Sequence, residues 1–417
     1  MSYIRNIATV FSGNIIAQAI PLILGPIITR LFTPEEVAVY GAYITIGSMF
    51  AVIACLRFEL AIMLPKTNEE ALEIVRRNVR LAFTVALISV LLSILFKDQM
   101  IEYTENKEVV YFLWAVPLMV FFTGVYQSFY NYTTRIKSYK KVTSSRVVQS
   151  TGVNGFAIVL NYLKTGPFGL VSGHVLGLFA STAILFKKEY IVGKVASLKE
   201  LFKNYRDFPL VNGPHAFTDI LFQRFGIMYL LIDFYGLEIY GFYELSNRYL
   251  KGPLRLITSS VAQVFFQQTA EEKSNDQSSM KTLIKTSFIS LGIGVPMLVV
   301  LLFFGEDLFA LVFGESWAMA GVVASIMVWS LFTNFLSSPI STIPILFNKQ
   351  KQAFVFGLLG QLIPLVISYG YMKGLFLSDF DFYDGDSKLN TLLIFSVSSS
   401  VYYLLMWLWY LKIARKS

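Results

Sequence analysis

Long apolar runs alternate with short polar segments along the whole chain. A helix that crosses a bilayer needs about 20 mostly apolar residues for roughly 30 Å of hydrocarbon. Windows of that length predict twelve membrane-spanning helices, near residues 7–30, 37–62, 79–96, 109–130, 147–163, 168–186, 212–233, 240–266, 283–304, 318–346, 353–377 and 389–411. No connecting segment exceeds about 25 residues, so any transport or chemistry takes place among the helices. The pattern predicts an all-α polytopic membrane protein.

Composition supports a membrane location and excludes several other classes. Hydrophobic residues make up 55% of the 417-residue chain and charged residues 15%, and the mean hydropathy is +0.58. Soluble proteins carry about 25% charged residues, which keep their surface hydrated. The same values exclude intrinsic disorder, collagen and coiled coil. A disulfide scaffold is excluded because the one cysteine, Cys55, lies in an apolar run.

The net charge of +8 follows the predicted topology. With the N-terminus in the cytoplasm, and residues near the end of a span counted with the adjoining segment, 24 of the 35 Lys and Arg residues fall in cytoplasmic segments, six fall outside and five lie within spans. Short cytoplasmic loops of membrane proteins carry this excess of positive charge. We therefore expect both termini in the cytoplasm and no nucleic-acid partner.

A short motif recurs 200 residues apart. Tyr-Gly-x-Tyr occupies residues 40–43, at the start of the second predicted span, and residues 240–243, at the start of the eighth. Internal repeats are common in transporters, where binding sites lie at the repeat interface. The repeat predicts two six-helix lobes, residues 1–200 and 201–417, that enclose a central cleft and work by alternating access.

The eighth predicted span carries the most conspicuous charges. Glu244, Arg248, Lys251 and Arg255 follow one another at steps of four, three and four, which places them on one helical face. Each charge facing lipid would cost about 2.5–3.5 kcal/mol, whereas a water-filled cleft accepts them. The alternative is an amphipathic helix lying on the membrane surface. The short preceding loop and the topology favour a crossing helix that lines the cleft.

Weaker polar groups recur in three other spans, namely Asn14 and Gln18 in the first, Arg57 and Glu59 in the second, and His215, Asp219 and Gln223 in the seventh. Spacings of four place the first and third groups each on one helical face. For each group the alternative is structural, either an ion pair that neutralises itself between helices or a histidine satisfied in the interior.

Neither a metal site nor a cofactor is expected. The chain has two histidines and one cysteine, too few for a cluster of zinc ligands. Residues 379–386, between the last two spans, contain four carboxylates but lack the alternate spacing and distal Glu of a calcium loop. We expect a solvated acidic loop there.

Several segments resemble bacterial polysaccharide repeat-unit flippases of the O-antigen type. The matching segments are Ser12-Gly13-Asn14, PIITRLFTPEE at 26–36, RFELAIMLP at 57–65, GFYELSNR at 241–248, Pro253 and VAQVFF at 261–266. Ala38 and Glu238 stand where that family usually has Gly, which puts only local turn geometry in doubt. These flippases belong to the multidrug/oligosaccharidyl-lipid/polysaccharide (MOP) exporter superfamily.

The resemblance implies two six-helix lobes forming a V in the bacterial cytoplasmic membrane. It implies an undecaprenyl-pyrophosphate-linked oligosaccharide as cargo, moved to the outer leaflet for O-antigen, capsule or exopolysaccharide synthesis, with a polysaccharide polymerase and a chain-length regulator as partners. Under this hypothesis the phosphates are held by Arg57, Arg248, Lys251 and Arg255, the sugar hydroxyls by Asn14, Gln18 and Gln223, and ion coupling falls to His215, Asp219 and Glu244.

Three alternatives remain open at this point. A multidrug exporter would prefer an acidic cleft for cationic cargo, whereas the predicted spans hold five basic residues against four acidic ones. A lipid II flippase is a second alternative. Such flippases resemble chains with two further helices, which this sequence does not predict. A membrane-embedded polymerase or glycosyltransferase is the third, and it would present a large outer loop, whereas the outer segments here are about 15 residues or shorter.

Overall fold

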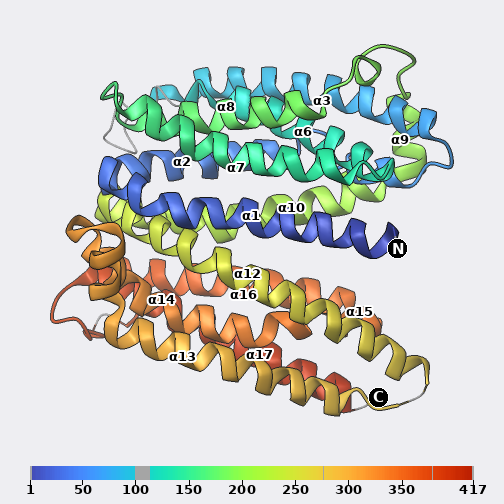
Figure 1. Ribbon diagram of the computed structural model, residues 1–417. Coiled ribbons are helices and arrows are strands. Elements are labelled where there is room, and N and C mark those ends of the chain that lie inside the picture. The colour runs from blue at the N-terminus through green and yellow to red at the C-terminus, as the bar shows by residue number, and fades with distance from the viewer. Residues whose placement is uncertain (1, 99–112, 276, 378, 416–417) are drawn as a thin grey trace. The chain divides into compact units, whose positions relative to one another are not determined.

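The computed structural model describes residues 2–98, 113–275, 277–377 and 379–415. Within these ranges every regular element is helical (Figure 1). The side chains of residues 2–12, Asn14 and Ser274 lie outside the described set. The prediction of an all-α protein is confirmed for the described part of the chain.

The chain divides into two compact units, Met1–Gly241 (unit 1) and Phe242–Ser417 (unit 2). The division lies later than the expected lobe boundary at residue 200, and it falls within one long helix. The arrangement of two six-helix lobes as a V stays a prediction.

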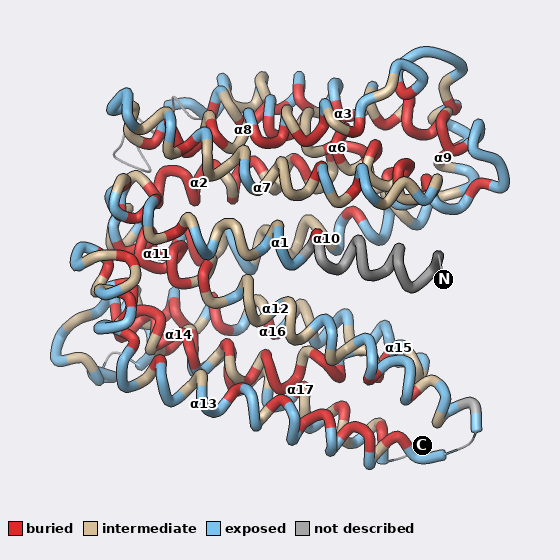
Figure 2. The backbone as a smooth tube through the Cα atoms, in the orientation of Figure 1, coloured by how far each residue is buried: buried red, intermediate tan, exposed pale blue. Residues whose placement is uncertain are grey.

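Unit 1 contains the longer helices α1 (Ser2–Leu31), α2 (Pro34–Ala51), α3 (Asn68–Leu95), α6 (Val116–Arg135), α7 (Tyr139–Asn161) and α8 (Pro167–Leu185). Its remaining helices are α9 (Leu198–Tyr205), α10 (Gly213–Ile220), α11 (Ile227–Tyr235) and the short turns η1 (Leu60–Met63), η2 (Lys188–Tyr190), η3 (Phe208–Asn212) and η4 (Leu221–Gly226). The α7 helix packs against α8 and α1, and α3 packs against α6. Figure 2 shows α2 as mostly buried, so it lies in the core of its unit.

The helix α12 (Leu237–Ser274) begins in unit 1 and continues in unit 2. Unit 2 also contains α13 (Met280–Phe313), η5 (Glu315–Trp317), α14 (Ala318–Ser337), η6 (Ser338–Ile340), α15 (Ile343–Leu346), α16 (Gln350–Met372) and α17 (Ser387–Arg415). The α14 helix is the most buried of these and packs against both α13 and α17.

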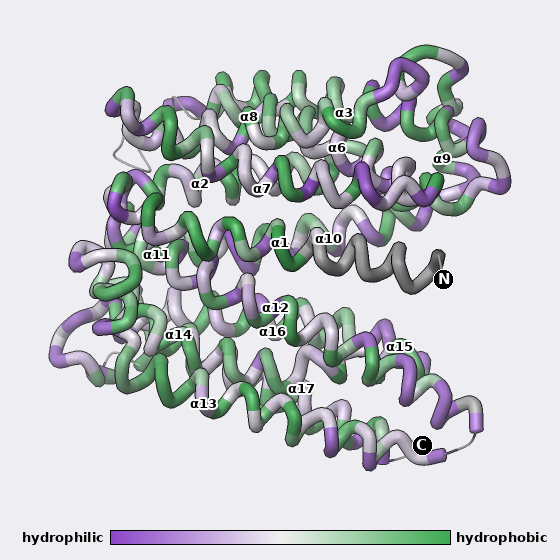
Figure 3. The backbone as a smooth tube through the Cα atoms, in the orientation of Figure 1, coloured by the Kyte–Doolittle hydropathy of each residue, from purple (hydrophilic) through white to green (hydrophobic). Residues whose placement is uncertain are grey.

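Six helical segments in the described residues are long and apolar enough to cross a membrane, and they are Asn68–Leu95, Pro167–Leu185, Met280–Phe313, Glu315–Leu346, Gln350–Met372 and Ser387–Arg415. Figure 3 shows long hydrophobic stretches along α3 and α13. Large apolar side chains on these two helices are exposed, among them Phe83, Leu87, Phe303 and Leu311. Such continuous exposed apolar surface fits lipid rather than water. The chain is a multi-pass membrane protein, and the total of twelve spans stays a prediction.

Helix starts and close helix contacts follow from local sequence. At the start of α2, Thr33 accepts from the Glu36 amide, the Glu36 carboxylate accepts from the Thr33 amide, and Pro34 occupies the first turn. This reciprocal cap satisfies amides that a helix start leaves without partners. Gly173 and Gly177 of α8 lie directly against the α7 backbone, since a Cβ at either would lie 2.6–2.7 Å from it. Small residues at such interfaces let membrane helices approach closely.

The second predicted span is wrong in its latter half. The α2 helix ends at Ala51, and residues 52–59 form successive tight turns instead of continuing to residue 62. Leu56 and Arg57 adopt positive φ angles of 49° and 64°, a region that residues other than Gly rarely occupy. Irregular backbone in a membrane protein is tolerated where protein groups satisfy it. Here the Asn131 amide nitrogen of α6 donates to the Glu59 carbonyl oxygen at 2.9 Å.

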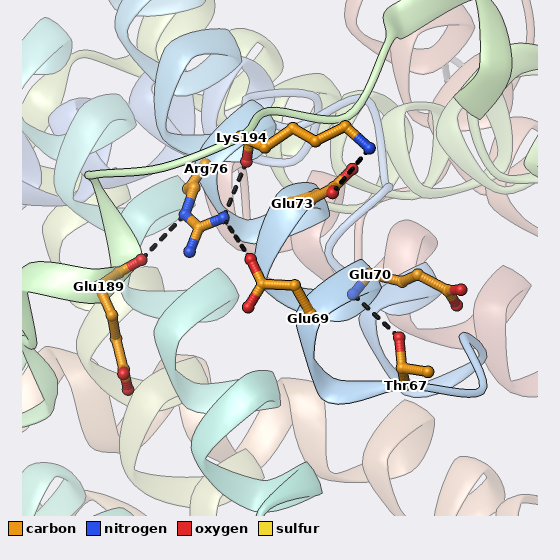
Figure 4. Close-up of polar contacts among 7 residues, drawn as sticks. All are labelled: Thr67, Glu69, Glu70, Glu73, Arg76, Glu189 and Lys194. Atoms are coloured by element: carbon orange, nitrogen blue, oxygen red, sulfur yellow. Dashed lines mark hydrogen bonds and ion pairs between the residues drawn. The ribbon is translucent and has the colours of Figure 1, made fainter.

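The segment that leads from α8 to α9 is fixed to α3 by buried arginine (Figure 4). The side chain of Arg76 is 5% exposed and donates to the carbonyl oxygens of Glu189 and Lys194, at 2.9 and 2.8 Å, and to the Glu69 carboxylate at 2.9 Å. Lys194 in turn pairs with Glu73 at 3.2 Å. This basic segment, expected as a simple cytoplasmic loop, is therefore an ordered part of unit 1.

Candidate functional site

A polar cavity of about 690 Å³ lies within unit 1, between α1, the turn at residues 52–60, α6 and α7. Its wall contains five amides, three hydroxyls and three charged groups, contributed by Gln18, Gln127, Asn131, Gln149, Asn154, Tyr126, Tyr130, Ser150, Arg57, Glu59 and Arg146. Most ligand pockets are lined mainly by apolar side chains with few polar groups. Here eleven of the fifteen wall residues have polar side chains, although the cavity lies among helices of a membrane protein.

Helical spacing explains how these polar groups converge. On α7, Arg146, Gln149, Ser150 and Asn154 recur at steps of three, one and four, so they share one face. The same face packs on α1, where the Ser150 hydroxyl donates to the Ala17 carbonyl oxygen at 2.6 Å. On α6, residues 126–131 supply two tyrosines and two amides one turn apart. Each of these helices turns a polar stripe toward the cavity.

An ion pair forms one corner of the cavity. Arg57 Nη1 lies 3.4 Å from Glu59 Oε1, and the two side chains are 23% and 4% exposed. The left-handed backbone at Arg57 makes this contact between near neighbours. The sequence placed both residues in a continuous helix, where residues two apart point in different directions. The turn that ends α2 is therefore what brings them together.

A second arginine faces the same cavity. The Arg146 guanidinium lies 4.7 Å from the centre of the Tyr130 ring, within the range of a cation–π interaction. The sequence predicts Arg146 in a cytoplasmic loop, since the predicted fifth span begins at residue 147. The structure places it in the second turn of α7 instead. Its spacing from Gln149, Ser150 and Asn154 is the signal that reveals it.

The predicted residues of the first and seventh spans have different outcomes. Gln18 lies in the cavity wall, whereas the side chain of Asn14 lies outside the described residues. His215 and Asp219 share a face of α10, as expected, with Nδ1 and Oδ2 3.4 Å apart. Gln223 lies in the π-helical turn η4, four residues beyond Asp219, and its place on this face stays a prediction.

The charged face of α12 belongs to unit 2. Glu244 Oε1 and Arg248 Nη2 lie 3.6 Å apart, as their spacing of four predicts, and these side chains are 11% and 31% exposed. Lys251 and Arg255 follow on the same helix and are exposed. The four residues thus lie on a continuous helix that runs through Pro253. Their roles in binding stay predictions.

The carboxylates of residues 379–386 hold the local structure of their loop. Asp381 accepts from the Gly385 amide and from the Asn390 side chain, both at 2.8 Å, and these donors lower its pKa. Asp386 accepts from the amides of Lys388 and Leu389 at the start of α17. Across the described residues, no three His, Cys, Asp or Glu side chains gather as a metal site would need.

Comparisons with known proteins agree with this architecture. A sequence family described as polysaccharide biosynthesis protein matches residues 27–322. No curated protein matches the chain in sequence.

Solved structures with the same fold are membrane transporters. The lipid II flippase MurJ, in an inward closed conformation, matches with a TM-score of 0.69 and 15% identity, covering 99% of this chain and 88% of that one. An inward-facing multidrug resistance MATE family transporter of the MOP superfamily matches with a TM-score of 0.64 and 13% identity, covering 97% and 99%. A MOP superfamily transporter from Pyrococcus furiosus, described as having a binding pocket of reverse polarity, matches with a TM-score of 0.52 and 12% identity, covering 99% and 94%. At 12–15% identity, these structural similarities show the fold alone.

Proposed function

Because the chain belongs to the polysaccharide biosynthesis protein family and has the MOP transporter fold, we propose that it is a flippase for a lipid-linked oligosaccharide. The cargo is an undecaprenyl-pyrophosphate-linked repeat unit, moved from the cytoplasmic to the outer leaflet of the bacterial inner membrane by alternating access. Both termini lie in the cytoplasm in this proposal, as the distribution of Lys and Arg favours. A polysaccharide polymerase and a chain-length regulator are the proposed partners in the pathway.

The polar cavity of unit 1 is the observation that carries this proposal. Sugars and phosphates cannot cross hydrocarbon without polar partners, because each unsatisfied polar group costs several kcal/mol there. A wall of amides, hydroxyls and guanidinium groups supplies such partners within the fold of a membrane transporter. Gln18 is one of these groups, in agreement with its proposed contact to sugar.

The α12 cations supply the phosphate contacts of the proposal. Arg248, Lys251 and Arg255 lie on one helix, and guanidinium groups bind phosphate oxygens in pairs. His215, Asp219 and Glu244 remain proposed carriers of the coupling ion, and both acids already lie beside a basic partner. Gln223 retains its proposed sugar contact, although it lies outside the cavity wall described above.

The alternatives fit the site less well. Two guanidinium groups against one carboxylate give the cavity of unit 1 a net positive charge, which disfavours a cationic drug. The fold similarity to a lipid II flippase concerns the scaffold and leaves the saccharide open. A polymerase or glycosyltransferase is disfavoured by both the family and the transporter fold.

Replacing Arg248 and Arg255 together by Ala tests the proposal in a host that lacks its own flippase. We expect surface polysaccharide to fall about tenfold or more, because each charge-assisted hydrogen bond contributes about 1.5–3 kcal/mol. The matched control removes two exposed cations of α13, with Lys281→Ala and Lys285→Ala, and should restore polysaccharide fully. Full restoration by the Arg248/Arg255 variant at normal protein level would refute the assigned phosphate contacts.

A further inference from the structure

Two polar atoms in the cavity wall lack partners. The contact between Arg57 Nη1 and Glu59 Oε1 leaves Arg57 Nε and Glu59 Oε2, and both are buried without a hydrogen bond to any described residue. Burying such a group without a hydrogen-bond partner is unfavourable. Both residues line the cavity, so its wall contains one donor and one acceptor that no described residue satisfies.

The presence of both an unsatisfied donor and an unsatisfied acceptor limits which ligands fit. A ligand that satisfies both must accept from Arg57 and donate to Glu59, and hydroxyl groups do both. Pyrophosphate offers acceptor oxygens and negative charge, so it would be repelled by the Glu59 carboxylate. A cationic amine would satisfy Glu59 and be repelled by Arg57. The hydroxyl groups of a sugar have the chemistry to satisfy both atoms.

The rest of the wall has the same character. Gln18, Gln127 and Gln149 each present an amide that both donates and accepts, as carbohydrate hydroxyls require. Arg146 already lies over the Tyr130 ring, so its charge is directed partly at protein. The volume of about 690 Å³ is within the usual range of ligand sites.

We infer that the unit 1 cavity binds the saccharide part of the cargo, with Arg57 and Glu59 holding neighbouring sugar hydroxyls, and that the pyrophosphate is bound elsewhere. This inference rests on the proposed function, since it assumes a lipid-linked oligosaccharide. It moves Arg57 from the phosphate contacts expected from sequence to the sugar contacts. The α12 cations keep the phosphate.

Photo-crosslinking in living cells distinguishes the two parts of the cargo. A benzophenone amino acid replaces Leu60, an exposed residue of the cavity wall, or Ser259, exposed on α12 four residues after Arg255. Cells making polysaccharide are fed a radiolabelled sugar and irradiated, and the purified protein is treated with mild acid. The acid hydrolyses the bond between the first sugar and the pyrophosphate. Only a crosslink to the saccharide itself then keeps the label on the protein.

We expect the label at position 60 to survive acid and the label at position 259 to be released. Label at 259 with none surviving at 60 would overturn the inference and leave the proposed function standing. Label at neither position, in variants that still restore surface polysaccharide, would overturn both. Gln18, also exposed in the cavity wall, provides a second crosslinking position should the Leu60 variant not accumulate.

A substitution at the ion pair tests the hydroxyl contact itself. Glu59→Leu removes the unpartnered acceptor, so we expect less acid-stable label at position 60 while the label at position 259 persists. Glu306→Leu removes an exposed carboxylate of α13 as the control and should change neither signal. Unchanged acid-stable label in the Glu59 variant would exclude that residue from the sugar contacts.

Discussion

Asn131 holds the turn that carries Arg57 and Glu59, because its amide nitrogen donates to the Glu59 carbonyl oxygen at 2.9 Å. Arg135, one turn further along α6, donates to the Pro65 carbonyl oxygen at 2.6 Å. These two side chains donate to carbonyl oxygens in a part of the chain that is no longer α-helical, as non-helical backbone in a membrane protein requires. The ion pair at the cavity corner is thus fixed by neighbours on α6.

Sequence patterns identify some of these residues and miss others. An arginine and a glutamate in an apolar run are conspicuous, so Arg57 and Glu59 were found without a structure. Their contact was hidden, because it depends on a left-handed backbone at Arg57 that hydropathy does not encode. A window chosen for apolar content excludes the charged beginning of α7 and so leaves Arg146 in the preceding loop. A search for shared helical faces recovers it.

Gly177 is a residue whose replacement should destabilise unit 1. A Cβ there would lie 2.6 Å from the Val153 backbone nitrogen of α7, so even Gly177→Ala pushes α7 and α8 apart. Overpacking of this kind costs about 1–3 kcal/mol. We expect a lower melting temperature in detergent, measured by thermal unfolding. Gly155→Ala is the control, since nothing lies within 4 Å of its Cβ, and an equal loss there would contradict the packing argument.

At the scale of elements, regular helices follow from sequence and their interruptions do not. The last two helices, α16 and α17, begin within a few residues of the expected spans at 353 and 389. The end of α2 at Ala51 and the π-helical turns η3 and η4 were missed. The turn that follows α2 is held by a tertiary contact, the hydrogen bond from the Asn131 side chain of α6 to the Glu59 carbonyl oxygen, which hydropathy does not encode.

The Arg76→Ala variant tests whether Arg76 holds the segment between α8 and α9 in place. Removing the guanidinium leaves the Glu189 and Lys194 carbonyl oxygens without their donor, at a cost of about 1–3 kcal/mol. We expect trypsin to cut after Lys188 and Lys194 faster than in the unaltered protein, measured by limited proteolysis in detergent. Arg80→Ala, which removes an exposed arginine one turn along α3, should leave the rate unchanged. Equal rates in both variants would show that Arg76 does not hold the segment.

On the scale of the whole molecule, membrane insertion and fold class follow from composition, because a chain with 15% charged residues cannot cover a water-exposed surface. Hydropathy alone does not define the number of spans. Helices that carry polar faces, such as α7 and α12, score poorly as spans although they are long enough to cross a bilayer. Polar residues that line a transport path therefore lower the hydropathy of the helices that carry them, and these helices are harder to identify as spans.

Cysteine labelling tests the predicted orientation, because the single native cysteine, Cys55, is 2% exposed. A membrane-impermeant maleimide should therefore report only on introduced cysteines. Lys388→Cys, at the start of α17, should react in intact cells, whereas Lys351→Cys, at the start of α16, and Lys199→Cys on α9 should react only after permeabilisation. The reverse pattern would place both termini outside. Labelling of positions 351 and 388 from the same side would mean that α16 does not cross the membrane, and twelve spans would no longer fit the chain.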